Sequence, residues 1–139
     1  MSDAEHSREG SVEIWRSRDG TLRMWLAAPS VALSTVVGHF DVALAHGFLT
    51  FSSRIIARHV DSFHDWSGTT GYDGETRRLF TSWVAEHRDD LGRIVICTKS
   101  RLVRMGIATA RLTLGGKVEA VATRRELDEQ IAQATCKTH

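Results

Sequence analysis

The sequence predicts a single α/β domain with a mostly parallel central sheet, an N-terminal antiparallel hairpin and four helices. After two opening strands, helix-like and strand-like segments alternate, which is typical of parallel strands joined by crossover helices. The run RIVICT, from Arg93 to Thr98, is rich in β-branched residues and apolar on both faces. Such a run is expected in the middle of a parallel sheet. The length of 139 residues suits one domain with a hydrophobic core.

The first predicted element is a hairpin, formed by VEIWRS and TLRMWLA on either side of Arg18-Asp19-Gly20. A two-residue Asp-Gly loop would pair Trp15 with Met24. A three-residue loop with Gly20 in the left-handed conformation is favoured, because its register gives the hairpin one apolar face. The pairs expected from this register are Val12 with Leu26, Ile14 with Met24, and Arg16 with Leu22.

The opposite face of this hairpin is a candidate interaction surface, made of Trp15, Arg23 and Trp25. Tryptophan and arginine are enriched where proteins bind partners, and an exposed aromatic patch usually marks an interface. The alternative is that the N-terminal tail or a neighbouring helix covers the tryptophans. The sequence leaves both interpretations open.

The middle of the chain is predicted to be a helix from Val36 to Ile56, followed by a short strand around His59 to Asp65. Apolar residues repeat at helical spacing in the first segment, although Gly38 and Gly47 weaken the pattern. These residues are Val36, Val37, Phe40, Leu44 and Phe48. The following run, Ser67-Gly68-Thr69-Thr70-Gly71, is interpreted as a turn that leads into the next helix.

The second half of the chain predicts three helices with clear starts. Asp73 is expected to cap a helix that runs through Asp90, and Ser100 one that runs through Leu114. KVEAVA is predicted as a short strand. Thr123-Arg124-Arg125-Glu126 has the pattern of a capping box and predicts the start of the last helix. The inner stripe of that helix is expected to be Leu127, Ile131 and Ala134.

Composition excludes several classes of function. The formal net charge of +1 argues against a nucleic-acid binder, and no apolar run is long enough for a membrane span. The polar start predicts no signal peptide, and Cys97 and Cys136 form no C-x-x-C motif, so a cytoplasmic protein without disulfides is expected. Residues 1–11 are predicted to be a disordered polar tail, 12–135 the domain, and 136–139 a C-terminal tail.

The order of elements resembles the STAS fold, the domain of anti-sigma-factor antagonists, whose relatives are also compared with CRAL-TRIO lipid-binding domains. The local matches are Gly71-Tyr72-Asp73 at the start of a helix and SRLVRMG from Ser100 to Gly106. In antagonists an Asp-Ser-Ser-Gly motif carries a serine that a kinase phosphorylates. Here the corresponding run is Asp65-Trp66-Ser67-Gly68, so Trp66 stands where that serine would be.

We find no complete catalytic set. His59, Asp61 and Asp65 would share one face of a strand and His64 the other, which is too few convergent ligands for a metal site, so no metal and no cofactor are expected. No lysine accompanies the Gly-Ser-Thr run, as a P-loop would need, although an anion at the following helix is an alternative. Cys97 is expected to be a buried, inert thiol. Ser67, Thr69 and Thr70 are candidate phosphoacceptors near Arg77 and Arg78.

The predicted function is therefore a non-enzymatic regulatory or protein-interaction module of STAS type, expected to self-associate as a homodimer. The alternative is a domain that binds a small apolar ligand or lipid. Such a ligand would lie between the Val36–Ile56 segment, the Ser100 segment and the sheet edge, where the glycines at 38, 47 and 106 would leave room.

Overall fold

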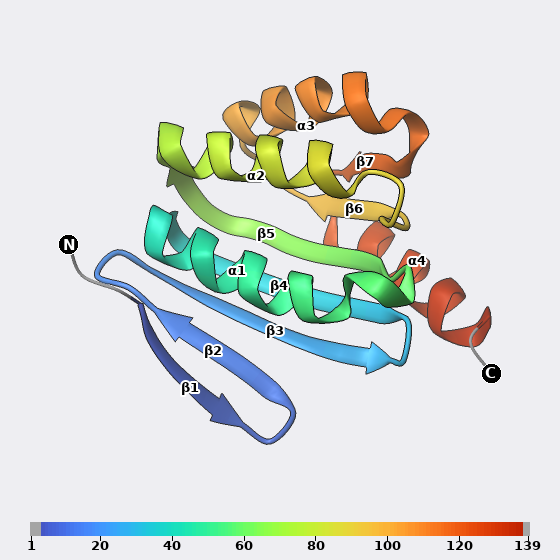
Figure 1. The fold of residues 1–139 in the computed structure, drawn as a ribbon, viewed down its shortest axis with the longest axis horizontal. Coiled ribbons are helices and arrows are strands. Elements are labelled where there is room, and N and C mark those ends of the chain that lie inside the picture. The colour runs from blue at the N-terminus through green and yellow to red at the C-terminus, as the bar shows by residue number, and fades with distance from the viewer. Residues whose placement is uncertain (1–3, 138–139) are drawn as a thin grey trace.

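The described part of the chain, residues 4–137 of a computed structural model, is built on one seven-stranded sheet (Figure 1). The strands are β1 (Glu5–Glu9), β2 (Val12–Arg16), β3 (Gly20–Ala28), β4 (Val31–Phe40), β5 (Asp61–Tyr72), β6 (Ile94–Cys97) and β7 (Val118–Val121). The helices are α1 (Val42–Ile55), α2 (Gly74–His87), α3 (Arg101–Leu114) and α4 (Arg124–Lys137). Short 3-10 turns follow α1 at Ile56–Arg58 and α3 at Gly115–Lys117.

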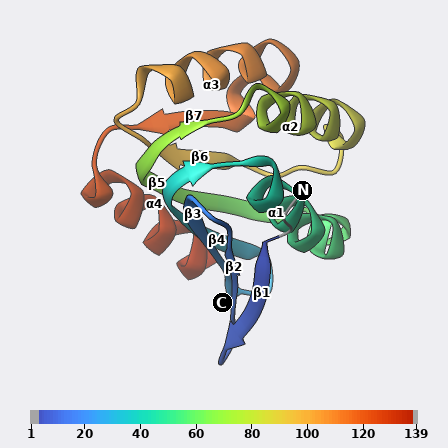
Figure 2. The ribbon, with the colours of Figure 1, turned by 90° about the vertical axis from the view of Figure 1, so that its left-hand side faces the viewer.

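The strands lie in the sheet in the order in which they occur in the chain. Neighbours from β1 to β4 are antiparallel, and neighbours from β4 to β7 are parallel. Three right-handed crossovers that advance in one direction put their helices on the same face. Figure 2 shows α4 on the opposite side of the sheet from α1 and α2. The predicted α/β class, parallel centre and four helices are confirmed, but the antiparallel part has four strands instead of two.

The first extra strand, β1, lies in the segment that was expected to be a disordered tail. Residues 5–9 pair with β2, and the His6 ring stacks on Trp15 at 4.5 Å between centroids. The His6 imidazole also contacts the Glu13 carboxylate at 3.0 Å, and Arg54 of α1 reaches the same carboxylate at 2.6 Å. A tail that is polar by composition is therefore held to the sheet edge by specific pairs that composition does not reveal.

The predicted register of the β2–β3 hairpin is wrong by one residue. Arg16 pairs with Thr21 and Trp15 with Leu22, so four residues, 17–20, separate the two members of the last pair. Gly20 does not adopt a left-handed conformation; it begins β3, and a Cβ there would collide with the carbonyl oxygen of His39. Because side chains alternate along a strand, the shift of one residue moves Trp15 to the other face.

Trp15 and Trp25 therefore lie on opposite faces of the sheet, and the predicted surface of Trp15, Arg23 and Trp25 does not form. Trp15 is buried beside Phe51 of α1, with His6 stacked over it. A side chain at Gly47 would come within 2.7 Å of the Trp15 ring, so this glycine lets helix and strand approach closely. The alternative, in which the tail and a neighbouring helix cover this tryptophan, is the correct one.

The second extra strand, β4, replaces the first part of the helix expected from Val36 to Ile56. Val36, Val37 and Phe40 imitate helical spacing over a few residues, but pairing with both β3 and β5 makes this segment a strand. The helix begins only after Phe40. Asp41 is its N-cap, and its carboxylate accepts a hydrogen bond from the Leu44 amide at 3.0 Å.

The run from Ser67 to Gly71 is not a turn. It continues β5, with Gly68 beside Val37 and Gly71 beside His39, and register shifts interrupt the pairing with β4. Asp73 is the N-cap residue of α2, as predicted, but its side chain makes no capping bond and instead contacts His39 Nε2 at 2.7 Å. The glycines and hydroxyls therefore belong to a long, irregular strand.

The remaining helix starts follow the sequence signals. Ser100 Oγ accepts a hydrogen bond from the Val103 amide at 3.3 Å, and Thr123 Oγ1 accepts one from the Glu126 amide at 3.2 Å. The inner stripe of α4 contributes buried Leu127 and Ala134 and half-buried Ile131. One of these helices is shorter than predicted, since α2 ends at His87 and not at Asp90.

Candidate functional site

A pocket of about 220 Å³ lies between the sheet and helices α1, α2 and α3. Most of its lining is apolar, with Phe48 from α1, Phe80 from α2 and Ile107 from α3 facing the strands. A cavity of about 150 Å³ lined by apolar side chains binds a molecule the size of benzene. This pocket is therefore large enough for a small organic molecule of about ten non-hydrogen atoms.

An aromatic cluster of Phe40, Phe48, Trp66 and Phe80 forms one wall of this pocket. Phe48 and Phe80 meet edge to face at 5.1 Å between centroids, and Phe40 meets Trp66 in the same way at 5.2 Å. Edge-to-face contact between large rings is a favourable arrangement. The cluster therefore forms an apolar wall of the pocket.

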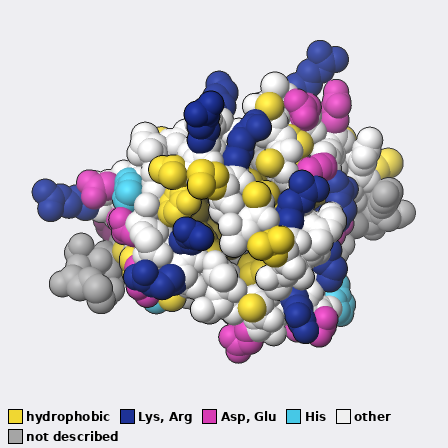
Figure 3. Space-filling view, turned by 90° about the horizontal axis from the view of Figure 1, so that it is seen from above, with side chains coloured by type: hydrophobic (Ala, Val, Ile, Leu, Met, Phe, Trp, Pro, Cys, Tyr) yellow, Lys and Arg dark blue, Asp and Glu magenta, His cyan; other side chains and the backbone are white. Residues whose placement is uncertain are grey.

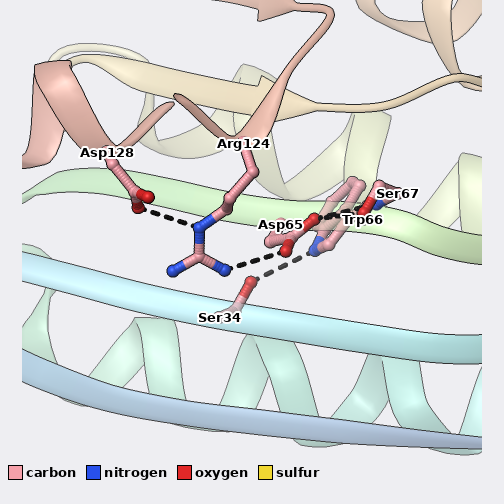
Figure 4. Close-up of polar contacts among 6 residues, drawn as sticks. All are labelled: Ser34, Asp65, Trp66, Ser67, Arg124 and Asp128. Atoms are coloured by element: carbon pink, nitrogen blue, oxygen red, sulfur yellow. Dashed lines mark hydrogen bonds and ion pairs between the residues drawn. The ribbon is translucent and has the colours of Figure 1, made fainter. Parts of the chain in front are cut away.

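A buried hydrogen-bonded chain runs behind the pocket from Trp66 through Ser34 to His64. The Trp66 indole Nε1 donates to Ser34 Oγ at 3.1 Å, and Ser34 Oγ lies 2.5 Å from His64 Nδ1 (Figure 4 shows the first of these contacts). The Trp66 indole can only donate, and among the described residues His64 Nδ1 is the only acceptor within reach of the Ser34 hydroxyl hydrogen, so we assign this hydroxyl as the donor to Nδ1. His64 Nδ1 is then the acceptor, and the ring hydrogen is on Nε2.

His64 is neutral in this environment. It lies on β5, is almost completely buried, and lines the pocket. Desolvation lowers its pKa to about 3, because a charged imidazolium has no water around it there. Among residues 4–137, Nε2 has no hydrogen-bond partner. A neutral N–H donor at the wall of an apolar pocket is suited to a single acceptor on a bound molecule.

Thr69 provides a second unsatisfied polar group in the same pocket. Its hydroxyl oxygen is buried and has no hydrogen-bond partner within the described part of the chain. Leaving a buried hydroxyl unpaired costs about 1–3 kcal/mol, so such groups are rare and call for an explanation. A polar group of a bound molecule beside Thr69 would supply the missing partner. His64 and Thr69 pair with Ser34 and Gly38, which are four residues apart on β4, so about 13 Å separates the two groups and a single acceptor can reach only one of them.

The pocket lies in the region where the sequence analysis expected room for a ligand, but most of the residues expected to make that room do not line it. Gly106 of α3 lines the pocket, as expected. Gly38 and Gly47 do not; Gly38, with φ of 91°, packs against the Asp19 carbonyl, and Gly47 packs against Trp15. His64 and Thr69 were not predicted as pocket residues. The position of His64 could have been predicted from the alternation of side chains along β5, which puts it on the same face as Trp66.

The opposite face of β5 carries an ionic cluster around Asp65 (Figure 4). Arg124, the first residue of α4, contacts Asp65 Oδ2 at 2.9 Å and Asp128 Oδ1 at 2.8 Å. The Ser67 amide and hydroxyl both donate to Asp65 Oδ1, at 3.1 and 2.6 Å. Partial burial opposes ionisation of Asp65, but the hydrogen bonds from Ser67 and Arg124 outweigh it and lower the pKa of the carboxyl. The cluster ties the start of α4 to β5.

The three candidate phosphoacceptors are in different environments. Ser67 and Thr70 are exposed on β5, whereas Thr69 is buried in the pocket. Ser67 was expected near the N-terminus of α2. It lies instead within β5, because this strand continues to Tyr72. The Ser67 hydroxyl donates to the Asp65 carboxylate, and the same carboxylate accepts from Arg124. Ser67 is thus linked to Arg124 through Asp65.

The histidines and carboxylates of the opening of β5 do not converge on one site. His59 Nδ1 contacts the Asp90 carbonyl, and the Asp61 carboxylate accepts from the Arg93 amide. In the part of the chain that is described, no group of three His, Cys, Asp or Glu side chains is placed to hold a metal ion. Cys97 is buried, and desolvation, with the nearby Asp65 charge, raises the pKa of its thiol.

Comparison with known proteins supports the fold and gives no function. No protein-family model matches the chain, and no curated protein matches it. Among solved structures, it is similar to an uncharacterized protein of the DUF3478 family, with a SpoIIAA-like fold, from Shewanella loihica PV-4. The TM-score is 0.59 at 14% identity, over 94% of this chain and 98% of the other.

This likeness defines the class of the protein by fold. The chain has the STAS-like fold, as the sequence resemblance implied, and it combines that fold with an apolar pocket that carries two unpaired polar groups. None of the helices over residues 4–137 is long and apolar enough to cross a membrane.

Proposed function

We propose that this STAS-type domain is a non-enzymatic binding module that holds a small, mostly apolar molecule with one hydrogen-bond acceptor. The observation that carries the proposal is the pocket of about 220 Å³ beneath α1, α2 and α3. Ligand pockets are typically apolar with a few placed polar groups that fix orientation. His64 Nε2–H and the Thr69 hydroxyl are groups of this kind.

The chemistry of these groups narrows the class of molecule. Both are uncharged, since His64 has a pKa of about 3 and stays neutral near pH 7. A neutral donor favours a carbonyl, ether or hydroxyl oxygen, because a carboxylate would lose its hydration without a buried cation to replace it. We therefore expect a ketone, ester or alcohol with a compact hydrocarbon body.

Matched probe molecules test this proposal. Indane and 1-indanone have the same bicyclic shape, and only the second carries a carbonyl acceptor. Both should raise the thermal midpoint of unfolding, since a molecule that binds only the folded state stabilises it. The ketone should bind about tenfold more tightly, as a buried hydrogen bond contributes roughly 1–1.5 kcal/mol.

Variants test whether the probes bind in the pocket. Ala110→Leu puts a larger side chain at the pocket wall and should abolish binding of both probes. Ala132→Leu, at an exposed position of α4, is the matched control and should change nothing. The carbonyl can meet only one of the two donors, so either Thr69→Val or His64→Asn should reduce the preference for the ketone and keep indane binding. The variant that does so identifies the donor. The proposal fails if neither probe binds, or if Ala110→Leu binds both as the unchanged protein does.

A regulatory switch is the second candidate function, and the exposed Ser67 favours it. The Ser67 hydroxyl donates to Asp65, which in turn pairs with Arg124 of α4. A phosphate there would repel Asp65 and compete for Arg124, which would loosen the start of α4. In this case Ser67→Asp should speed amide exchange in the first turn of α4, and Thr70→Asp should not. Equal exchange in both variants would remove this candidate.

A further inference from the structure

The outer face of α3 is unlike the rest of the surface. Four large hydrophobic side chains are exposed among the described residues, and three are on α3: Leu102 at 57%, Met105 at 65% and Leu112 at 88% exposed. Their spacing of three and seven residues puts them in one row along the helix. Single exposed apolar residues are ordinary, but a contiguous row of them marks a surface that binds something.

The α3 segment is also strongly basic. Between positions 99 and 117 there is no Asp or Glu, and the charged residues are Lys99, Arg101, Arg104, Arg111 and Lys117. Arg104 and Arg111 are seven residues apart, so they form a second row on one side of the apolar row. In the described structure none of the three arginines of α3 has a carboxylate partner. These are free positive charges beside free apolar surface.

Helix α2 adds positive charge on the other side of the apolar row. Arg77 lines the pocket between α2 and α3, and the Arg88 carbonyl accepts from Lys117 Nζ at 3.0 Å, so both residues lie close to the α3 segment. In the view from above, yellow apolar patches lie among dark blue basic side chains, and acidic side chains lie toward the edges (Figure 3). Arg77 is therefore a cation on the α2 side of the row, whereas Arg88 is followed by Asp89 and Asp90, so the positive charge of this face comes mainly from α3.

We infer that this face, α3 with the facing edge of α2, docks on the surface of an anionic lipid membrane. A helix with exposed leucine and methionine and with Lys and Arg along its sides has the composition of a helix that lies in a membrane interface. The apolar row enters the boundary of the acyl chains, and the arginines remain at the level of the anionic headgroups, each contributing to attraction.

A second copy of the chain fits this face less well. A twofold contact places the same patch on both subunits against itself. The arginine rows would then face each other with no acidic residue between positions 99 and 117 to compensate them. An anionic lipid surface supplies the opposite charge and the apolar phase together. This inference does not depend on what the pocket holds.

Vesicle co-sedimentation of the full chain tests the inference. The protein should bind vesicles of phosphatidylcholine with one quarter phosphatidylglycerol and not vesicles of phosphatidylcholine alone. Binding should weaken as salt rises from 50 to 500 mM, because exposed charges are screened. Replacing Arg104 and Arg111 by Gln should weaken binding on the order of fivefold for each charge removed. Met105→Ser with Leu112→Ser should abolish it.

Matched variants on other faces serve as controls. Arg125→Gln removes an exposed arginine from α4, and Val37→Ser removes the fourth exposed hydrophobic side chain, on β4. Neither should change vesicle binding, and circular dichroism should show all variants folded. Ala110→Leu, which fills the pocket, should still bind vesicles, so failure of the ligand proposal is separable from failure of this one. The inference is overturned if the protein ignores anionic vesicles, or if it is a dimer that Leu112→Ser converts to a monomer without any vesicle binding.

Discussion

The two faces of the sheet, compared along the single strand β5, are packed in opposite ways. Toward α4, Phe63 is buried with Val95 and Leu127, and the Asp65–Arg124 pair closes the edge. Toward α1, α2 and α3, the next residues, His64 and Trp66, line a pocket of about 220 Å³. Adjacent residues of one strand therefore serve a closed core on one side and an open site on the other.

The difference lies in how each face is covered. One helix, α4, lies over the parallel strands, and its apolar stripe meets β-branched and aromatic side chains closely. Three helices share the other face, and the large rings of Phe40, Phe48 and Phe80 meet edge to face between them. The pocket lies where the three helices meet over the sheet. The α1–α3 face therefore holds both the larger share of the buried hydrophobic residues and the pocket, whereas the α4 face is smaller and closed.

The largest expected effect is a difference in the loss of stability when one core residue is shortened on each face of the sheet. Leu127→Ala should destabilise the protein by about 3–4 kcal/mol, because it opens a cavity in a closed region. Ile107→Ala, at the pocket wall, should cost about 2 kcal/mol, since that side chain already lacks neighbours on one side. Urea denaturation of both variants measures the difference. Equal losses would mean that the pocket face is as closely packed as the α4 face.

The next effect concerns pH and the pocket face alone. The pKa of His64 is near 3 in the folded chain and 6.5 in the unfolded chain, so below pH 6.5 the unfolded chain binds the proton first. Folding stability is therefore full above pH 6.5 and falls toward pH 3, with a loss of about 2 kcal/mol by pH 5.

The variant His64→Asn isolates this contribution, because an amide oxygen can still accept from Ser34 but does not titrate. Its unfolding free energy should change less between pH 7 and 5, by about 2 kcal/mol, than that of the unchanged protein. Ala132→Leu is the control and should keep the original pH dependence. An identical pH profile for His64→Asn would show that His64 is not the group responsible.

The smallest expected effect is at the ionic edge of the closed face. The Asp65 side chain is 20% exposed and the Arg124 side chain 55%, so water screens the pair. A double-mutant cycle with Asp65→Asn and Arg124→Gln should give a coupling of about 0.5–1 kcal/mol. The depressed pKa of Asp65 means that this coupling is present above pH 4 and lost as pH falls and the carboxylate is protonated. A coupling above 2 kcal/mol would mean that the edge contributes as much as the core.

Local signals in the sequence predicted a large part of the fold. The caps at Asp73, Ser100 and Thr123 are at the starts of α2, α3 and α4, because capping depends on a few neighbouring residues. RIVICT is a central parallel strand, since burial on both faces demands apolar residues at every position. The STAS-like fold followed from the order of these elements.

The errors arose where distant residues decide. The polar β1 is held by Trp15 and Glu13, and the hairpin register is set by α1, which buries Trp15 against Gly47. Likewise, β4 is a strand because it pairs with β3 and β5, although its apolar residues have helical spacing over a few positions. In each case the deciding partner is more than five residues away in the chain, beyond the reach of local pattern.

By itself, the sequence determined the class of the fold, the helix starts and the central strand, because hydrophobic period and capping are local chemistry. The basic and apolar residues of α3 can also be found in the sequence, since their spacing along a helix is a local property. Only the tertiary structure decided which residues share the pocket. His64 and Thr69 come from one strand, but their unpaired polar atoms, and the space in front of them, exist because three crossover helices cover that face without filling it.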